Sequence, residues 1–254
     1  MAKETCVLMH APVLRGLVRR RILVNFRVDP EVIQRQLPPP FRPHLVDGWA
    51  IAGICLIRLE HLRPMGIPGA LGMCSENAAH RVAVTWTDAA SRPRQGVYIP
   101  RRDTGSSLNH LAGGRLFPVQ HHRARFRVRD DPGAIDLVLE SEDGSADVRL
   151  RARASDGLPS TSAFASLQAA SDFFAGGSVG YSATKDGARL DGLEFRTLAW
   201  RVEALEVQSV FSAYFADASR FPPGSIAFDS ALVMRDLPHE WRPVPAPTAL
   251  RLGR

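Results

Sequence analysis

Two adjacent histidines, His121 and His122, are the residues best suited to chemistry in this chain. They follow a stretch with helical spacing, residues 108–117, and open a segment with strand-like alternation. Successive side chains of a strand point to opposite faces, so one imidazole should face the body of the protein and the other the solvent. An unperturbed histidine titrates near pH 6.5, so it can donate or accept a proton in catalysis. We predict His121 as a proton-transfer group and His122 as a neighbouring substrate contact.

Glu76, His80 and Glu60 form a second set of candidates. Glu76 and His80 are four residues apart in a strand-like segment and therefore share a face. Paired carboxylates near an arginine can adopt different protonation states, which gives one site both an acid and a base. We predict Glu76 as a second catalytic group, with Glu60 and His80 as substrate contacts. An ordinary Arg–Glu ion pair that lines the core is the alternative.

Two further motifs carry less weight. His121, His80 and Glu76 are acceptable metal ligands, but no ligand spacing points to a metal, so we predict neither a metal nor another cofactor. Residues 176–180, GGSVG, match the G-x-S-x-G pattern of a nucleophile elbow, which needs a strand before the serine and a helix after it. Here the helical spacing comes first, so we predict a turn.

The elements that would position these residues are mostly strands. Alternation and apolar runs predict strands at residues 22–28, 49–59, 79–86, 96–99, 121–129, 134–141, 146–153, 179–184, 198–206 and 226–234. Caps and helical spacing predict helices at residues 30–36, 108–117, 162–174 and 207–215. The fold class is therefore α+β, dominated by strands with a few packed helices. Without repeats or long linkers, residues 1–254 form a single domain, with residues 1–16 and 245–254 as flexible termini.

The composition is that of an ordinary soluble domain. Hydrophobic residues make up 45% and charged residues 23%, with a net charge of +6. Lys3 and Lys185 are the only lysines, and the arginines alternate along residues 123–129 and 149–153. Such alternation is typical of the solvated face of a sheet and does not indicate a nucleic-acid surface. The three cysteines lack metal-site spacing, and neither a leader nor a membrane span is evident, so we expect a cytoplasmic protein without membrane contact.

Several stretches together resemble a known family. These are Arg19–Pro40, Arg58–Pro68, Glu76–Val84, Ser171–Phe174 and Phe228–Pro243. Over residues 17–244 the chain is similar to the acetoacetate decarboxylase-like superfamily and, within it, to the DUF2071 family. The resemblance implies strongly curved antiparallel sheets that form a double-barrel-like body around a small-molecule cavity.

The resemblance also implies a change of chemistry. In the decarboxylases a helix leads into a Pro-Lys-Lys sequence whose first lysine forms a Schiff base with the substrate. The two lysine positions fall on His121 and His122 here, and an imidazole cannot form an iminium with a ketone. Arg19 matches the arginine of the family's first strand and would hold the substrate. Glu76 and Glu60 match, or fall near, two glutamate positions of the cavity.

The functional hypothesis is a cofactor-independent lyase or isomerase that uses acid–base chemistry next to the carbonyl of an oxo or carboxylate substrate. Dehydration, cyclisation, retro-aldol cleavage and decarboxylation through an enol all belong to this class. The alternative is a non-catalytic small-molecule binding protein on the same fold. A third alternative, an anionic polymer bound by the arginine-rich strands, has no motif to support it. The sequence leaves open whether the chain acts alone or as a homo-oligomer.

Overall fold

The structure is a computed structural model that describes residues 12–106, 121–184 and 187–247 of the 254. The helix predicted at residues 108–117 lies outside the described residues. Strands dominate the described part of the chain, as predicted. They are β1 (Leu14–Val28), β2 (Arg42–Pro43), β3 (Leu45–Val46), β4 (Trp49–Pro64), β5 (Met73–Thr87), β6 (Pro93–Thr104), β7 (His122–Asp131), β8 (Ala134–Ser141), β9 (Val148–Ser155), β10 (Val179–Ala183), β11 (Leu190–Thr197), β12 (Glu203–Ser212) and β13 (Ile226–Val244). The described helices are α1 (Pro30–Gln34), the 3₁₀ turn η2 (Gly69–Leu71), α3 (Leu167–Gly176) and α4 (Ala213–Ala216).

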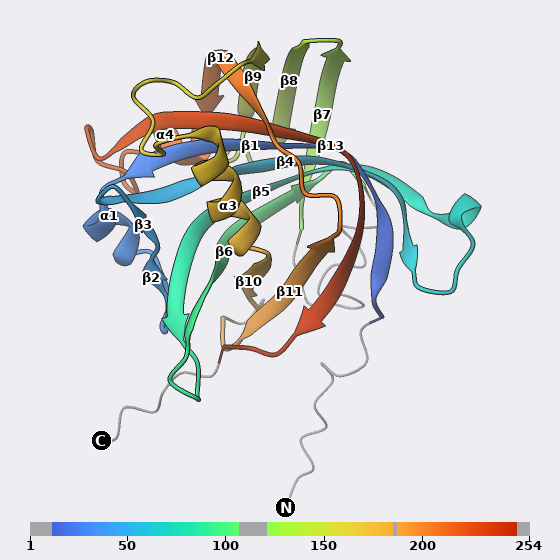
Figure 1. Cartoon of the computed structure of the whole chain (residues 1–254), viewed down its shortest axis with the longest axis horizontal. Helices are drawn as coiled ribbons and strands as arrows, with labels where there is room; N and C mark the ends of the chain where they lie inside the picture. Colours follow the sequence, from blue (N-terminus) through green and yellow to red (C-terminus); the bar gives the residue numbers. More distant parts are fainter. Residues whose placement is uncertain (1–11, 107–120, 185–186, 248–254) are drawn as a thin grey trace, which may run out of the picture.

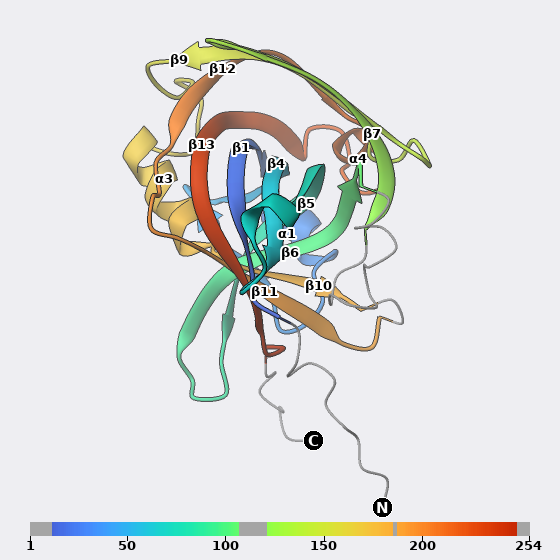
Figure 2. The same ribbon diagram turned by 90° about the vertical axis from the view of Figure 1, so that its right-hand side faces the viewer.

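The strand pairings close two rings. The first ring runs through β6, β7, β8, β9, β12, β13, β1, β4 and β5, and the second through β6, β10, β11, β13, β1, β4 and β5. All these pairs are antiparallel except β6 with β7 and β6 with β10. Figure 1 labels the elements, and Figure 2 shows β7, β9 and β12 arching over β13, β1, β4 and β5. The body is therefore double-barrel-like, as the resemblance implies, although neither ring is a regular barrel.

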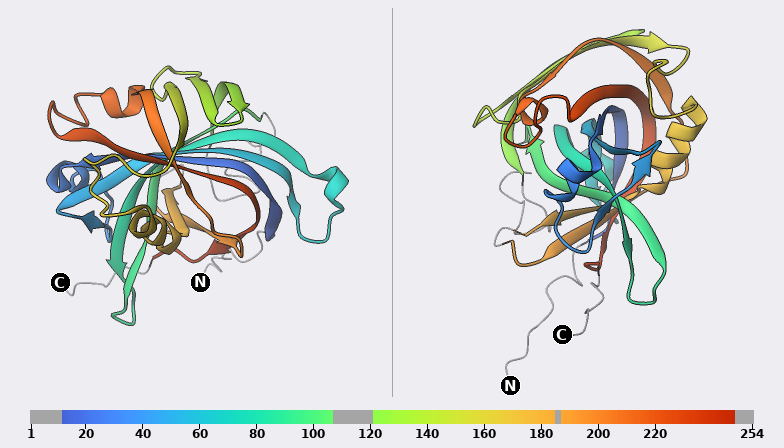
Figure 3. Two further views of the ribbon diagram at one scale, coloured as in Figure 1. Left: turned by 45° about the horizontal axis from the view of Figure 1, so that its top comes forward. Right: turned by 90° about the vertical axis from the view of Figure 1, so that its left-hand side faces the viewer.

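Each ring encloses its own apolar core, because the shared strands bury both faces. Ile22 and Val24 of β1 belong to the core of the first ring, and Leu23 between them belongs to the core of the second. Phe174 of α3 packs into the second core, and Figure 3 shows α3 on the outside of the strands. Strand β4 is buried continuously from Ala50 to Ile57, which explains its unbroken apolar sequence.

Two predicted elements were wrong. Residues 207–212 form a strand, part of β12, instead of a helix, and α4 covers only Ala213–Ala216. A bulge between Val207 and Ser209 shifts the alternation of β12, so the apolar residues fall at three- and four-residue spacing like those of a helix. The strand predicted at residues 198–206 begins only at Glu203. The first strand also starts earlier than the predicted residue 22, because β1 begins at Leu14.

Other local predictions were confirmed. β8 has the predicted bounds, and the arginines at 123, 125, 127 and 129 are exposed while the residues between them are partly buried. Gly176 ends α3 and Val179 begins β10, so a helix precedes Ser178 and a strand follows it, the reverse of a nucleophile elbow. No helix among the described residues is long and apolar enough to span a membrane.

Candidate functional site

A row of charged side chains crosses four adjacent strands at one end of the first ring. Arg20 of β1 is in register with Arg235 of β13 on one side and with Arg58 of β4 on the other, and Arg58 is in register with Glu76 of β5. Asp130 of β7 reaches the row from the other wall of the ring. We call these five residues the Arg20 cluster.

Arg20 is the centre of this cluster. Its Nη2 donates to Oε2 of Glu76 at 2.8 Å, and its Nη1 donates to Oδ2 of Asp130 at 3.3 Å. Arg235 holds both oxygens of Asp130, at 2.9 and 2.7 Å. Only 4% of the Arg20 side chain is exposed, whereas Glu76 is 16% and Arg235 38% exposed. A small molecule can therefore reach the carboxylate and the outer arginines, while Arg20 stays shielded.

The two carboxylates of the cluster are driven in opposite directions. Burial raises the pKa of Glu76 above its ordinary value, although Arg20 and Arg58 oppose the shift. Burial also acts to raise the pKa of Asp130, but its bonds to Arg235 and Arg20 outweigh burial and lower it. Neighbouring acids with separated pKa values give a site one carboxyl group that can exchange a proton and one permanent anion.

Arg19 and Glu60 lie next to this cluster and not inside it. Arg19 is half exposed and bonds to Glu60 and to Asp236, with 2.6 Å between its Nη1 and Oδ1 of Asp236. A bulge between Val18 and Arg20 makes Arg19 the extra residue of β1, so the next arginine takes the inward position. Glu60 still connects to the cluster, because Nε of Arg58 lies 3.6 Å from its Oε1.

His80 shares the inward face of β5 with Glu76, as the spacing predicts, but it is fully buried. Its ring packs against that of Tyr214 in a tilted arrangement, with centroids 4.5 Å apart, and neither ring nitrogen has a hydrogen-bond partner. Burial, with smaller effects from Arg101 and Arg220, lowers its pKa to about 3. The four-residue spacing along β5 corresponds to roughly 13 Å, so His80 lies away from the Arg20 cluster.

His121 and His122 differ in exposure, as the alternation predicts. His122 is exposed and opens β7, where it is in register with Asp103 of β6, and His121 is partly buried. His122 belongs to the strand face of Asp130, eight residues further along β7. Within the described residues, neither histidine forms a hydrogen bond or an ion pair with Glu76. No three His, Cys, Asp or Glu side chains of the described chain lie close enough together to hold a metal ion.

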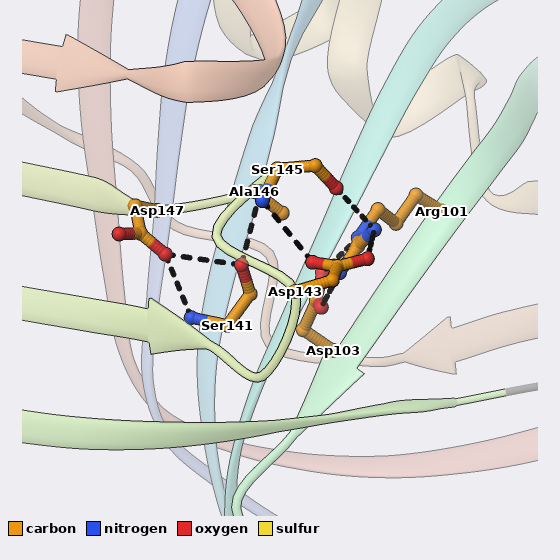
Figure 4. A network of polar contacts seen from close by, with 7 residues as sticks. All are labelled: Arg101, Asp103, Ser141, Asp143, Ser145, Ala146 and Asp147. Carbon is orange, nitrogen blue, oxygen red and sulfur yellow. Dashed lines mark hydrogen bonds and ion pairs between the residues drawn. The ribbon is translucent and has the colours of Figure 1, made fainter.

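Figure 4 shows a polar clamp that the sequence interpretation missed. One of its residues, Asp103, is in register with His122. Arg101 donates to Asp103 on its own strand at 2.8 Å and to Asp143 at 2.8 and 2.9 Å, and its Nη1 donates to Oγ of Ser145 at 2.7 Å. These bonds tie β6 to the turn between β8 and β9. Burial raises the pKa of Asp103, against the opposing pull of Arg101 and His122. The i, i+2 spacing of Arg101 and Asp103 was the only signal in the sequence, and the turn that completes the clamp lies 40 residues further on.

Together, the two joined rings and the inward charged row define an acetoacetate decarboxylase-like fold with an arginine–carboxylate site. The model of the DUF2071 family, described as an uncharacterised conserved protein, matches residues 18–231, and the chain belongs to this family. A search of curated protein sequences returned no match.

Solved structures agree on the fold. Acetoacetate decarboxylase from Legionella pneumophila is similar with a TM-score of 0.62 and 12% identity, over 99% of this chain and 93% of that one. An acetoacetate decarboxylase-like enzyme from Sphingomonas wittichii RW1 has a TM-score of 0.60 and 14% identity, over 94% of each chain. The enduracididine biosynthesis enzyme MppR, solved with pyruvate, has a TM-score of 0.56 and 14% identity, over 94% of this chain and 93% of that one.

Proposed function

We propose that this protein is an enzyme that acts next to the carbonyl of a small oxo or carboxylate substrate, without a cofactor and without a Schiff base. The observation that carries the proposal is the buried Arg20–Glu76 ion pair inside a fold shared with acetoacetate decarboxylase-like enzymes. MppR supports the substrate class, since it was also solved with the condensation product of pyruvate and imidazole 4-carboxaldehyde. The absence of an imine rests on the sequence: no described residue is a lysine, and His121 and His122 occupy the matched lysine positions.

The roles follow from charge and exposure. Arg58 and Arg235 are about one-third exposed and offer guanidinium groups to a substrate carboxylate. Glu76, whose pKa is raised by burial, takes the proton from the carbon next to the carbonyl. In a dehydration, that C–H electron pair forms the new C=C bond and a β-hydroxyl leaves as water with a proton from His121. In an isomerisation, the enol regains a proton at another carbon.

The first step can be tested without knowing the natural substrate. Pyruvate in D₂O exchanges its methyl protons when an enzyme enolises it, and proton NMR measures the rate. We expect wild-type protein to catalyse exchange and Glu76→Gln to lower the rate by roughly 10²–10⁴-fold. Glu206→Gln, which changes an exposed glutamate paired with Arg153 on the outer sheet, is the matched control and should leave the rate unchanged.

Borohydride separates this mechanism from an imine mechanism. Treatment of the protein with pyruvate and borohydride should leave the protein mass unchanged. A reduced adduct on Lys3 or Lys185 would overturn the proposal, because the reaction would then pass through a covalent amine intermediate.

Non-catalytic binding of the same class of small molecule is the second candidate function. It is favoured by one observation: neither His121 nor His122 forms a hydrogen bond or an ion pair with Glu76 in the described chain. Comparison of His121→Ala with wild type on one bound oxo acid distinguishes the two. Lost turnover with retained affinity indicates an enzyme, whereas binding without turnover in both proteins indicates a carrier.

A further inference from the structure

Three arginines meet inside the second ring, on the opposite face of the shared strands from the Arg20 cluster. Arg21 of β1 donates from Nε to Sγ of Cys55 on β4 at 3.3 Å. Arg81 of β5 and Arg102 of β6 also lie close enough to Cys55 for its thiol to affect their pKa values. The cluster therefore brings three guanidinium groups around one buried thiol.

Arg81 is the most enclosed of the three. It is 4% exposed, and its Nη2 donates to Oδ1 of Asn25 at 2.6 Å. Its Nε and Nη1 are buried and have no hydrogen-bond partner. Its guanidinium lies 4.7 Å from the centre of the Phe174 ring, so α3 closes the space above it. These two nitrogen donors of Arg81 are therefore available to a bound anion.

No carboxylate among the described residues is paired with these three arginines. Within the described chain, none of Arg21, Arg81 and Arg102 forms an ion pair with an aspartate or a glutamate. Arg21 lies over the rings of Phe195 and Trp200, at 4.9 and 5.8 Å, and Arg102 donates to Oγ of Ser182 at 3.3 Å. Burial lowers the pKa of Arg81 and of Arg102 to about 10, so both are still cations at neutral pH. Buried like charges without a counter-charge are costly, and an anion would offset that cost.

The available space limits the size of such an anion. A small pocket at this point has a volume of about 10 Å³, and its lining includes Arg21, Arg81, His44, Phe173 and Phe174. A volume of this order accepts about one water-sized group and excludes a whole metabolite. The rings of His44 and Phe173, which both line the pocket, pack in a tilted arrangement with centroids 4.6 Å apart.

We propose that the second ring binds a small monovalent anion, a halide ion or a single carboxylate group, between Arg21 and Arg81 under α3. The unused donors of Arg81 provide the hydrogen bonds, and Arg21 and Arg102 provide the remaining positive charge. This site is separate from the Arg20 cluster and does not depend on the proposed enzymatic function.

The melting temperature, Tm, of the purified protein tests this site. Sodium bromide, sodium acetate and sodium gluconate are titrated separately at constant ionic strength and neutral pH. Bromide or acetate should raise Tm in a saturable way, by roughly 3–6 °C at saturation, and gluconate should not. A response to bromide alone identifies a halide site, and a response to acetate identifies a carboxylate site. Equal responses to all three salts would overturn the proposal.

Three variants provide the controls. Arg81→Met should abolish the anion-specific rise in Tm. Arg102→Met changes a less buried arginine and should weaken the rise. It is the second test if Arg81→Met does not fold. Arg153→Met, at an exposed arginine of β9, should keep the full response. In Cys55→Ala the response should persist, because the arginines remain. A rise in Tm that is seen only in Cys55→Ala would mean that the thiol itself supplies the counter-charge, and would overturn the proposal.

Discussion

Arg20 and Arg21 are neighbours in the sequence, yet they occupy two different electrostatic environments. Arg20 points into the first ring and meets Glu76 and Asp130, whereas Arg21 points into the second ring and meets a thiol, aromatic rings and Arg81. The first environment is nearly neutral without any ligand. In the second, no carboxylate of the described chain offsets the positive charge. A strand shared by two rings can therefore place one arginine in each interior. The residues across each ring then decide whether the charge of that arginine is neutralised.

The largest expected effect concerns the first ring, where carboxylates neutralise Arg20. Arg20→Met leaves the partly buried Glu76 without its ion-pair partner and leaves Asp130 with Arg235 alone. Removing one member of a buried ion pair typically costs about 3–5 kcal/mol. We expect the free energy of unfolding in urea to fall by that amount at pH 7. Arg19→Met removes the adjacent, half-exposed arginine and should cost far less. Equal losses in the two variants would mean that burial of the pair is not what stabilises β1.

His80 tests whether the first ring tolerates charge without a partner. Its pKa is about 3 in the folded protein and 6.5 as its ordinary value, so the unfolded chain takes up the proton first as the pH falls. The neutral imidazole contributes its full stability above pH 6.5 and loses it toward pH 3. Between pH 6 and pH 4 we expect wild type to lose roughly 2–3 kcal/mol more than His80→Phe in urea unfolding. Parallel curves for the two proteins would contradict a buried, neutral His80.

A change at Arg81 tests the second ring, where no described carboxylate pairs with the arginines. Arg81→Met removes a buried cation, and no described carboxylate loses an ion-pair partner as a result. Replacement of a buried charge by an apolar side chain of similar volume is often neutral or stabilising. In buffer free of small anions we expect the free energy of unfolding to be unchanged or to rise by up to roughly 2 kcal/mol. A loss as large as that of Arg20→Met would remove the contrast between the two rings.

The smallest effect concerns the two acids of the Arg20 cluster. Because the pKa of Glu76 is raised in the folded protein, folding favours its protonated form. Its contribution to the free energy of unfolding is therefore complete below pH 4.5 and declines as the pH rises through the native pKa. The lowered pKa of Asp130 means that its contribution is present above pH 3.8 and is lost as the pH falls. Difference curves for Glu76→Gln and Asp130→Asn in urea unfolding should therefore slope in opposite directions. Slopes of the same sign would show that one of the two acids is not partnered as described.

Much of the fold could be predicted because the strands alternate strongly. The solvated arginines of β7 and the apolar run of β4 both follow from period two and from burial on two faces. The bulge in β12 could not be predicted, because a one-residue shift turns strand spacing into helix spacing. The helix predicted at residues 108–117 is not tested by the described chain.

The site was harder to predict than the fold. Three consecutive arginines, Arg19 to Arg21, gave no local signal of which one points into the first ring, and the bulge decides this. Asp130 lies 110 residues from Arg20, so only the closure of the first ring brings them together. The cation cluster around Cys55 likewise draws on four strands and has no spacing that a single stretch of sequence reveals.

The bulge at Arg19 also bears on how this protein can change in length over evolution. Arg19 is the supernumerary residue of β1, and its side chain points to solvent. Deletion of this one residue would restore simple alternation and leave Val18 and Arg20 on the faces they already occupy. Deletion of any residue from Arg21 to Val28 would instead move the side chains on one side of the deletion from one ring to the other. We therefore expect natural length variants of β1 to occur at the bulge and not beyond it.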